Sequence, residues 1–288
     1  MAELTLIETG GTICMEAGPE GLRPAPDRLR QAILDLKPGL SLRSQVLQPL
    51  VDSADIGPLI WNALLDRIDA APGAVLVTHG TDTMAFTGAA LDAALGGRGA
   101  SVVLCGSMQP LGVVGDALGN LALAISAAEQ ARPGVTLAFD GKLMPGGALT
   151  KAHSHAAAAF VCAGDPAPAS AFAARRFDPD LALAIVTISP GLSPAALEAT
   201  LGTLDGAVLR VFGAGTLPAG LATALARARA RGCHIVAVSQ CADGGLAPGA
   251  YAAGAALWAA GVDNGGLMSA EQALTRLWLR LSAPGAMA

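Results

Sequence analysis

The sequence predicts an α/β protein, with a doubly wound, mostly parallel sheet in a large N-terminal domain and a second, smaller α/β domain. Two observations support this fold class. Short apolar runs, typical of buried parallel strands, alternate with stretches of helical pattern through the first half of the chain. After a segment rich in proline and alanine, the same alternation resumes on a smaller scale. We therefore expect a large domain over residues 1–163, a linker over 164–181 and a small domain over 182–288.

The large domain begins with a strand expected at residues 4–7, which ends in two adjacent glycines. A loop rich in glycine and proline over 16–26 follows, and Asp27 is expected to cap a helix over 27–36. Pro58 stands in the first turn of the next expected helix, where its missing N–H costs nothing. The remaining strands are expected at 47–51, 75–77, 102–105 and 135–139, and the remaining helices at 58–70, 84–95 and 116–131.

The small domain repeats the pattern with shorter elements. Its apolar runs predict strands at 183–188, 208–212 and 235–238. Its helical patterns predict helices at 194–201, 218–231, 251–260 and 270–281.

Composition argues against several classes of function. The 288 residues are 52% hydrophobic and 14% charged, so the chain can build an ample core. A net charge of −5 argues against nucleic-acid binding, which needs a basic face. No G-x-G-x-x-G follows an expected strand, so a dinucleotide site has little support. Only Lys37, Lys142 and Lys151 of the 18 basic residues are lysines, which makes a lysine at a site a candidate for specific chemistry.

The cysteines and the start of the chain bear on its location. The five cysteines are scattered and form no C-x-x-C pair, as expected of free thiols in a reducing compartment. The first residues lead straight into the first strand without a signal-peptide pattern, and no apolar run reaches the ~18 residues of a transmembrane helix. We expect a soluble, cytoplasmic protein.

Polar residues follow several of the expected strands. Because the carboxyl ends of parallel strands meet at one edge of a sheet, such residues gather along one crevice there. Thr12 follows Gly10 and Gly11, and a hydroxyl on such a turn is a candidate nucleophile if a neighbouring base removes its proton. Taken alone, the stretch favours a plain glycine turn in which Thr12 caps a helix, and only the rest of the chain favours the nucleophile. The residues expected along the crevice are Thr12, Ser53, Thr81, Asp82 and Lys151.

Thr81, Asp82 and Lys151 together supply a hydroxyl, a carboxylate and a scarce lysine. A lysine can act as a base if desolvation lowers its pKa, and a neighbouring carboxylate would orient it. The alternative is that Thr81 and Asp82 cap the following helix and that Lys151 is a solvated loop residue. Two interpretations are likewise open for Asp52, Ser53 and Asp55, which could bind a polar substrate or cap a helix.

Histidines and a cysteine near these motifs receive structural interpretations. His153-x-His155 lacks a third ligand at zinc-like spacing, so no metal site is expected. His79, beside Gly80, could be catalytic, and the preferred interpretation is a structural histidine that holds its loop by hydrogen bonds. Cys14 lies close to Thr12, and nothing nearby marks it as a thiolate, so it is expected to pack as a small hydrophobic residue.

Several of these segments carry a resemblance to a known family. Three of them resemble the signatures of the bacterial L-asparaginase family: Thr9-Gly10-Gly11-Thr12-Ile13, Thr78-His79-Gly80-Thr81-Asp82-Thr83-Met84 and Leu149-Thr150-Lys151. Three more resemble the cytoplasmic type I branch: Asp52-Ser53-Ala54-Asp55, Gly106-Ser107-Met108-Gln109-Pro110 and Ser239-Gln240-Cys241. The resemblance covers essentially the whole chain, tightly as far as Lys151 and loosely after it.

The resemblance implies an enzyme that hydrolyses the side-chain amide of L-asparagine to aspartate and ammonia, without metal or organic cofactor. Thr12 would be the nucleophile, and a second catalytic cluster would handle protons. Asp82 and Asp52 would bind the α-ammonium group and Ser53 the α-carboxylate, while backbone N–H groups around Gly11, Gly80 and Thr81 would bind substrate and form an oxyanion hole. The family also implies a homodimer or homotetramer whose sites are completed by the partner's small domain. The second cluster consists of Thr81, Asp82 and Lys151.

The chain departs from the family pattern at the loop tyrosine, commonly found in Gly-Tyr-x-Pro. The matching segment here has Leu22, and the only tyrosine of the chain is Tyr251. The Gly-Asn usually contributed by the partner's small domain is replaced by Gly213-Ala214-Gly215, and the chain is short for the family. We therefore expect a slow enzyme whose rate rises with pH as Lys151 loses its proton. Two alternatives remain open, a weakly active or non-catalytic amino-acid-binding relative, and an amidase subunit of a tRNA-dependent amidotransferase.

Overall fold

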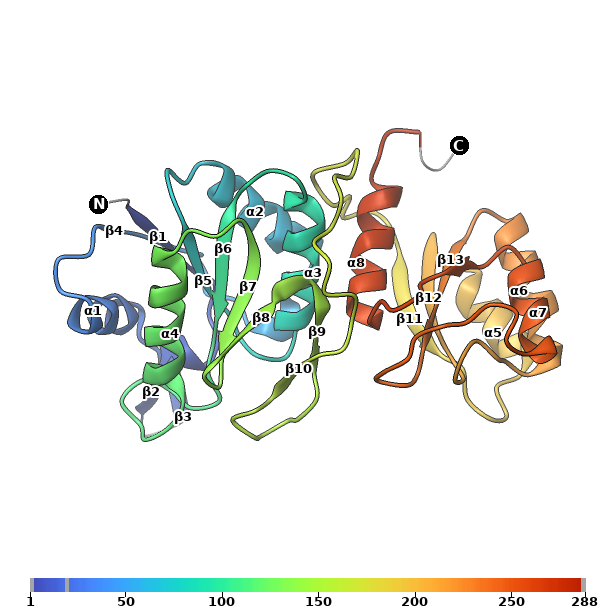
Figure 1. Ribbon diagram of the computed structural model, residues 1–288, viewed down its shortest axis with the longest axis horizontal. Coiled ribbons are helices and arrows are strands. Elements are labelled where there is room, and N and C mark those ends of the chain that lie inside the picture. The colour runs from blue at the N-terminus through green and yellow to red at the C-terminus, as the bar shows by residue number, and fades with distance from the viewer. Residues whose placement is uncertain (1–2, 19–20, 286–288) are drawn as a thin grey trace. The chain divides into compact units, whose positions relative to one another are not determined.

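The computed structural model describes residues 3–18 and 21–285 and divides into two compact units (Figure 1). The first unit runs to Cys162 and also includes Pro166–Arg176. The second consists of Ala163–Asp165 and the chain from Phe177 onward. The predicted linker over 164–181 is therefore shared between the two units.

The first unit is built on a six-stranded sheet with the order β4-β1-β5-β6-β7-β8. The first five strands of this order pair in parallel, and β8 (Lys142–Pro145) pairs with β7 in antiparallel fashion. The predicted doubly wound, mostly parallel sheet is thus confirmed. The parallel strands are β1 (Leu4–Glu8), β4 (Leu42–Val46), β5 (Val75–Thr78), β6 (Ser101–Cys105) and β7 (Gly134–Phe139).

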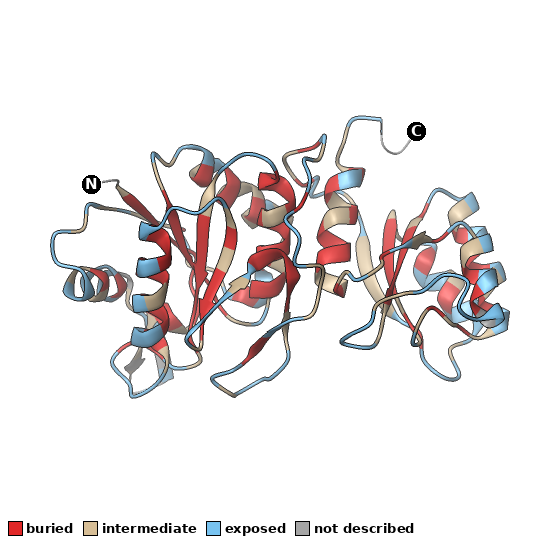
Figure 2. Ribbon diagram, in the orientation of Figure 1, coloured by how far each residue is buried: buried red, intermediate tan, exposed pale blue. Residues whose placement is uncertain are grey.

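Helices cover the two faces of this sheet. Helices α1 (Pro26–Leu36) and α4 (Ala117–Glu129) pack with each other, and their apolar side chains share one core with Leu6 and Leu76 of the strands. Helices α2 (Pro58–Asp69) and α3 (Met84–Leu95) pack together on the opposite face (Figure 1). The strands between the two layers are almost wholly buried, as parallel strands covered on both faces should be (Figure 2).

The order of the strands positions a site. From β1 the chain crosses to β4 on one side and then returns past β1 to β5 on the other. The loops that follow β1 and β5 therefore diverge at a topological switch point, the place where open α/β sheets bind ligands. Thr12 follows β1, and Thr81 follows β5.

Three expectations for the first half of the chain are wrong. Residues 47–51 are not a strand, because the strand beside β1 is β4 and ends at Val46, while Pro49 lacks the N–H that a ladder needs. The expected loop over 16–26 contains the hairpin of β2 (Met15–Gly18) and β3 (Gly21–Pro24). Asp27 does not cap α1, since the N-cap is Ala25 and the helix starts at a proline that needs no partner for its nitrogen.

Two short strands after β8 were also missed. Strand β9 (Leu149–Lys151) pairs in antiparallel fashion with β10 (Phe160–Cys162), and a short 3-10 helix, η3 (Gly146–Ala148), precedes them. Strands of three residues are too short to show the alternation by which a strand is recognised in a sequence. They matter here because Lys151 is the last residue of β9.

The second unit is a smaller α/β layer structure, as predicted. Its four strands pair in parallel in the order β11-β12-β13-β14, over a core to which Leu197, Leu225 and Leu257 contribute. Helix α8 (Ala270–Leu281) contacts three of the strands. The strands are β11 (Leu183–Thr187), β12 (Gly206–Val211), β13 (His234–Ser239) and β14 (Asp263–Asn264), and the other helices are α5 (Pro194–Leu201), α6 (Ala222–Ala230) and α7 (Ala255–Ala259).

Candidate active site

The turn after β1 depends on the backbone of two glycines. Gly11 has φ of +83°, and a Cβ at this position would overlap the backbone nitrogen of Gly80 in the loop after β5. Gly10 is similarly pressed against the backbone of Val51. Only glycine fits both the conformation and the contacts. Thr12 then begins a short 3-10 helix, η1 (Thr12–Cys14), and its side chain is half-buried.

Two further predicted residues lie at this turn, Gly80 in the loop after β5 and Ser53 in the segment after β4. A Cβ on Gly80 would lie 2.5 Å from Oγ of Ser53, so the Ser53 side chain covers Gly80 closely. Ser53 itself is buried, and its carbonyl accepts a hydrogen bond of 2.5 Å from Oγ1 of Thr83. Gly80 therefore lies against both Gly11 and Ser53 at the switch point.

Lys151, at the end of β9, contacts the loop after β5. Its Nζ donates to Oγ1 of Thr81 at 2.8 Å and to Oδ1 of Asp82 at 2.7 Å. The lysine side chain is only 17% exposed, whereas that of Asp82 is 67% exposed. The ammonium group is thus held between a hydroxyl and a carboxylate that still faces solvent. The structure brings together the three residues that the sequence suggested as a cluster, and excludes the alternative of a solvated Lys151.

Asp52 lies beside Ser53 and makes a local contact. Its Oδ1 accepts a hydrogen bond of 2.9 Å from the backbone N–H of Ala54, which caps the short 3-10 helix η2 (Ser53–Asp55). The capping interpretation therefore describes this carboxylate in the structure. A carboxylate has several acceptor positions, so one capping bond leaves others for a ligand.

His79 is completely buried between β5 and this loop, as the structural interpretation required. Its Nδ1 lies 2.6 Å from the carbonyl oxygen of Gly80, and its Nε2 lies 2.8 Å from Oγ1 of Thr87 in α3. Burial lowers the pKa of the imidazole to about 4, because the charged form would lose its hydration. Sequence reasoning missed Thr87; its only signal is a hydroxyl in a helix otherwise rich in alanine and leucine.

A second residue missed in the sequence is Glu8, the last residue of β1. It is 1% exposed, and Oγ of Ser44 donates to its Oε1 at 3.0 Å, while its Oε2 has no hydrogen-bond partner among the described residues. Burial raises the pKa of this carboxyl to about 7. The signal in the sequence is an acidic residue that ends an otherwise apolar strand.

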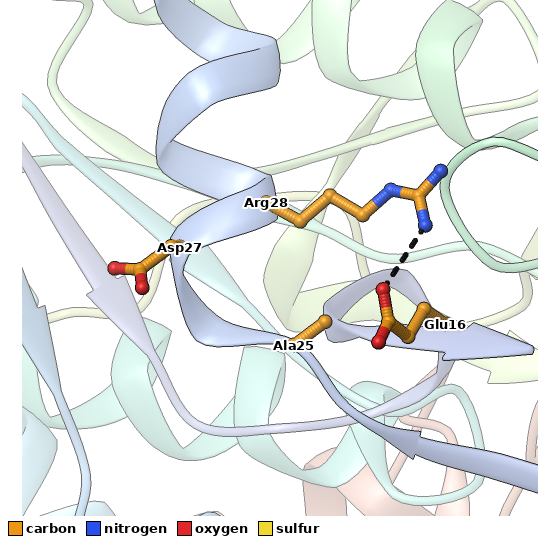
Figure 3. A pocket seen from close by; sticks show the side chains of 4 residues that line it. All are labelled: Glu16, Ala25, Asp27 and Arg28. Carbon is orange, nitrogen blue, oxygen red and sulfur yellow. Dashed lines mark hydrogen bonds and ion pairs between the residues drawn. The ribbon is translucent and has the colours of Figure 1, made fainter. Parts of the chain in front are cut away.

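A surface pocket of about 380 Å³ lies beside the hairpin and the start of α1 (Figure 3). Glu16, Ala25, Asp27 and Arg28 line it, and none of these belongs to the predicted site. Arg28 Nη1 lies 3.4 Å from Oε2 of Glu16, and Arg23 Nη2 lies 2.6 Å from Oε1 of the same carboxylate. Glu16 therefore ties the hairpin to α1.

Other features of the described residues bear on metals and membranes. No group of three or more potential ligands that could hold a metal ion occurs among them. His153 instead accepts backbone hydrogen bonds at its Nδ1 from His155 and Ala156, within the turn after β9. Over the part of the chain that the structure describes, every helix is too short or too polar to cross a membrane.

Comparisons with known proteins agree on the kind of protein. A family model described as "Asparaginase, N-terminal" matches residues 3–176, and one described as "Glutaminase/Asparaginase C-terminal domain" matches residues 182–286. These matches cover both units and define the protein as an amidohydrolase.

Similarity to individual relatives shows which amidohydrolases this chain resembles. An L-asparaginase of Thermococcus kodakarensis is 33% identical over 96% of this chain and 91% of its own, and L-asparaginase 1 of Escherichia coli is 32% identical over 95% and 90%. The solved structure of the thermostable L-asparaginase from Thermococcus kodakarensis has a TM-score of 0.86, with 30% identity over 99% of this chain and 94% of that chain. The chain belongs to the asparaginase family.

Proposed function

We propose that this protein hydrolyses the side-chain amide of L-asparagine to L-aspartate and ammonia through an acyl-enzyme on Thr12. One observation carries the proposal: Lys151 binds Thr81 and Asp82 at the switch point, in the loop whose Gly80 is pressed against Gly11. A candidate nucleophile and a hydroxyl–carboxylate–lysine cluster thus come from adjoining loops. This is the set of groups that acyl transfer through an activated hydroxyl requires.

The chemistry proceeds in two steps. Thr12 Oγ bonds to the amide carbon, the C–N bond breaks, and ammonia leaves with the proton of the threonine hydroxyl. Water then attacks the ester carbon, the bond to Thr12 Oγ breaks, and the hydroxyl is restored as aspartate leaves. The Thr81–Lys151 pair is the group we assign to carrying protons in both steps, with Asp82 holding the lysine in place.

Substrate recognition in this proposal uses the polar residues around the turn. Asp82, exposed and only singly bonded to Lys151, binds the α-ammonium group together with Asp52. Ser53 binds the α-carboxylate, and backbone N–H groups around Gly11 and Thr81 stabilise the oxyanion. Assembly into a homodimer or homotetramer and a cytoplasmic location remain predictions from the sequence.

The decisive experiment is ammonia release from a panel of L- and D-amino-acid amides by wild type, Thr12→Ala and Thr12→Ser. We expect wild type to act on L-asparagine, and Thr12→Ala to lose roughly a thousandfold or more of kcat/KM. The unfolding midpoint of Thr12→Ala should stay near wild type, because only a small polar group on a turn is removed. Thr12→Ser keeps the hydroxyl and should retain measurable turnover.

Two results would overturn the proposal. Substantial hydrolysis by well-folded Thr12→Ala would exclude Thr12 as the nucleophile. Absence of ammonia release from every free amide, with tight binding of an amino acid, would instead identify a non-catalytic binding protein.

A further inference from the structure

A chain of buried hydrogen bonds leads from α2 to the site. Trp61 Nε1 in α2 lies 3.1 Å from Oγ1 of Thr87, which lies 2.8 Å from Nε2 of His79. On the other side of the imidazole, Nδ1 lies 2.6 Å from the carbonyl oxygen of Gly80. All of these side chains are buried, so water cannot replace a lost partner without entering the core.

The groups at the two ends of this series of hydrogen bonds determine which atom donates in each bond. An indole N–H only donates, so the Thr87 oxygen accepts from Trp61. A carbonyl oxygen only accepts, so the proton of the neutral imidazole is on Nδ1 and points at Gly80. Nε2 then accepts, and the Thr87 hydroxyl donates to it. Every bond in the chain has one donor and one acceptor in this arrangement alone.

The hydrogen bond to Gly80 also fixes the next residue. The carbonyl of Gly80 and the N–H of Thr81 belong to one planar trans peptide, so they point in opposite directions. Holding the carbonyl toward His79 therefore holds the Thr81 N–H away from the imidazole. Within the described ranges, this N–H has no acceptor of its own. The side chain of the same residue is held separately by Lys151.

We propose that His79 is a positioning residue, whose neutral imidazole orients the Gly80–Thr81 peptide so that the Thr81 N–H is aimed at the oxyanion that forms during amide hydrolysis. This inference rests on the proposed function of the site. It assigns catalytic consequence to a side chain that touches neither substrate nor nucleophile. Thr87 supports the same tautomer indirectly, since its hydroxyl donates to Nε2 of the ring.

His79 does not act as a base in this scheme. The pKa lowered to about 4 by burial keeps the ring neutral over the range in which activity would be measured. Its contribution is therefore independent of pH from about 5 upward, whereas a general base would impose an acid limb on kcat/KM.

The test compares His79→Asn with His79→Leu. Asparagine places an amide N–H where the histidine has Nδ1, while leucine has a similar shape and no donor. Leucine is close to histidine in volume and asparagine is smaller, so a higher kcat in His79→Asn than in His79→Leu would not come from better packing at this buried position. We expect kcat of His79→Leu to fall roughly ten- to hundredfold, since removal of a whole oxyanion donor costs about 10²–10³, with KM changed by less than about twofold. His79→Asn should recover most of that loss.

Thr87→Val and Thr87→Ser test the same series of hydrogen bonds while the histidine is kept. Thr87→Val should lower kcat less than His79→Leu does, and Thr87→Ser should resemble wild type. Nitrogen chemical shifts of His79 provide a readout that does not depend on activity, and wild type should carry its ring proton on Nδ1.

The outcomes separate this inference from the proposed function. Equal kcat values for His79→Leu and His79→Asn, or a ring proton on Nε2 in wild type, would overturn the positioning role even in an active enzyme. If wild type releases no ammonia from any amide, the proposed function fails, and the ring proton still decides whether His79 donates to the Gly80 carbonyl. An acid limb of kcat/KM that disappears in His79→Asn would identify His79 as a base and refute the inference.

Discussion

The two halves of the site are held in place by different means. The turn that carries Thr12 is positioned by backbone contacts, since Gly11 lies against the backbone of Gly80 and neither has a side chain. The cluster of Thr81, Asp82 and Lys151 is positioned by side-chain hydrogen bonds of 2.7 and 2.8 Å. The difference teaches where each half is vulnerable. An added side-chain atom would displace the turn that carries Thr12, whereas removal of a charged side chain would disrupt the cluster of Thr81, Asp82 and Lys151.

Lys151→Met tests the side-chain half and should have the largest effect of the four changes considered below. We expect kcat/KM to fall by roughly 10² or more, the usual scale for loss of a general acid–base group. Lys142→Met is the matched control, because Lys142 is exposed and its nearest acidic partner, Asp140, is 3.8 Å away. Ammonia release under identical conditions measures both variants. Near-normal kcat/KM in Lys151→Met would mean that the lysine only holds the hairpin of β9 and β10.

Gly11→Ala tests the backbone half. The new methyl would overlap Gly80 in a conformation that alanine avoids, so we expect roughly a hundredfold loss of kcat/KM from misplacement of Thr12. The free energy of unfolding should fall by about 2–4 kcal/mol. Gly39→Ala is the control, because Gly39 has nearly the same φ of +82° but no atom within 4 Å of a Cβ. It should cost only about 1 kcal/mol and no activity. Similar losses in the two variants would show that backbone strain, and not the contact with Gly80, matters at the turn.

Leu22→Tyr installs the loop tyrosine that the family usually has at this position, in the hairpin that follows Thr12. The hairpin pairs Leu22 with Ala17, and the side chain of Leu22 lies outside what the structure describes. The family resemblance implies that a tyrosine at this position assists deprotonation of Thr12, so we expect kcat/KM to rise a few-fold. Tyr251→Phe should have no effect, since the Tyr251 side chain is 63% exposed. A large loss in Tyr251→Phe, with no gain in Leu22→Tyr, would show that a different hydroxyl serves the site.

Glu8→Gln should change stability and leave kcat nearly unaltered. A carboxyl with a pKa of about 7 in the folded protein and 4.5 in the unfolded chain contributes stability below pH 4.5 that is lost as the pH rises through 7. The loss amounts to about 3 kcal/mol for a shift of this size. Glutamine stays neutral and can still accept a hydrogen bond from Ser44. The free energy of unfolding of the variant should therefore rise relative to that of wild type as the pH increases from 4 to 8. Denaturant unfolding at both pH values measures this, and Glu129→Gln, at a half-exposed site, should show no such trend.

Much of the fold could be predicted from the sequence because buried parallel strands are apolar throughout. β5, β6 and β7 were recognised this way. β4 was missed because it is an edge strand paired only with β1, and its residues Leu42–Val46 are mostly polar. The more apolar run that follows it contains Pro49 and forms a loop. The polar residues of β4 thus reflect its position at the edge of the sheet and do not argue against a strand.

The site was predicted in part, for a similar reason. The sequence placed Thr81 and Asp82 at the carboxyl edge of the sheet because a parallel sheet collects its loops there, whereas Lys151 reaches them from β9, a short strand outside that sheet which the sequence did not show. It could not show the role of Thr87 or the burial of Glu8, because both depend on which elements pack above and below the strands. Hydrogen bonds such as that between Thr87 and His79 join residues of a helix and a loop without a motif to mark them.

The five thiols differ in exposure, which allows selective labelling of this protein. Burial raises the pKa of Cys14 to about 12 and also raises those of Cys105 and Cys233, so these thiols present almost no reactive thiolate near neutral pH. Cys162 and Cys241 are exposed, one in each unit. Maleimide dyes should therefore attach at one place on each unit of the natural sequence. Energy transfer between the two dyes would then report, in solution, how the separation of the units responds when an amide substrate is added.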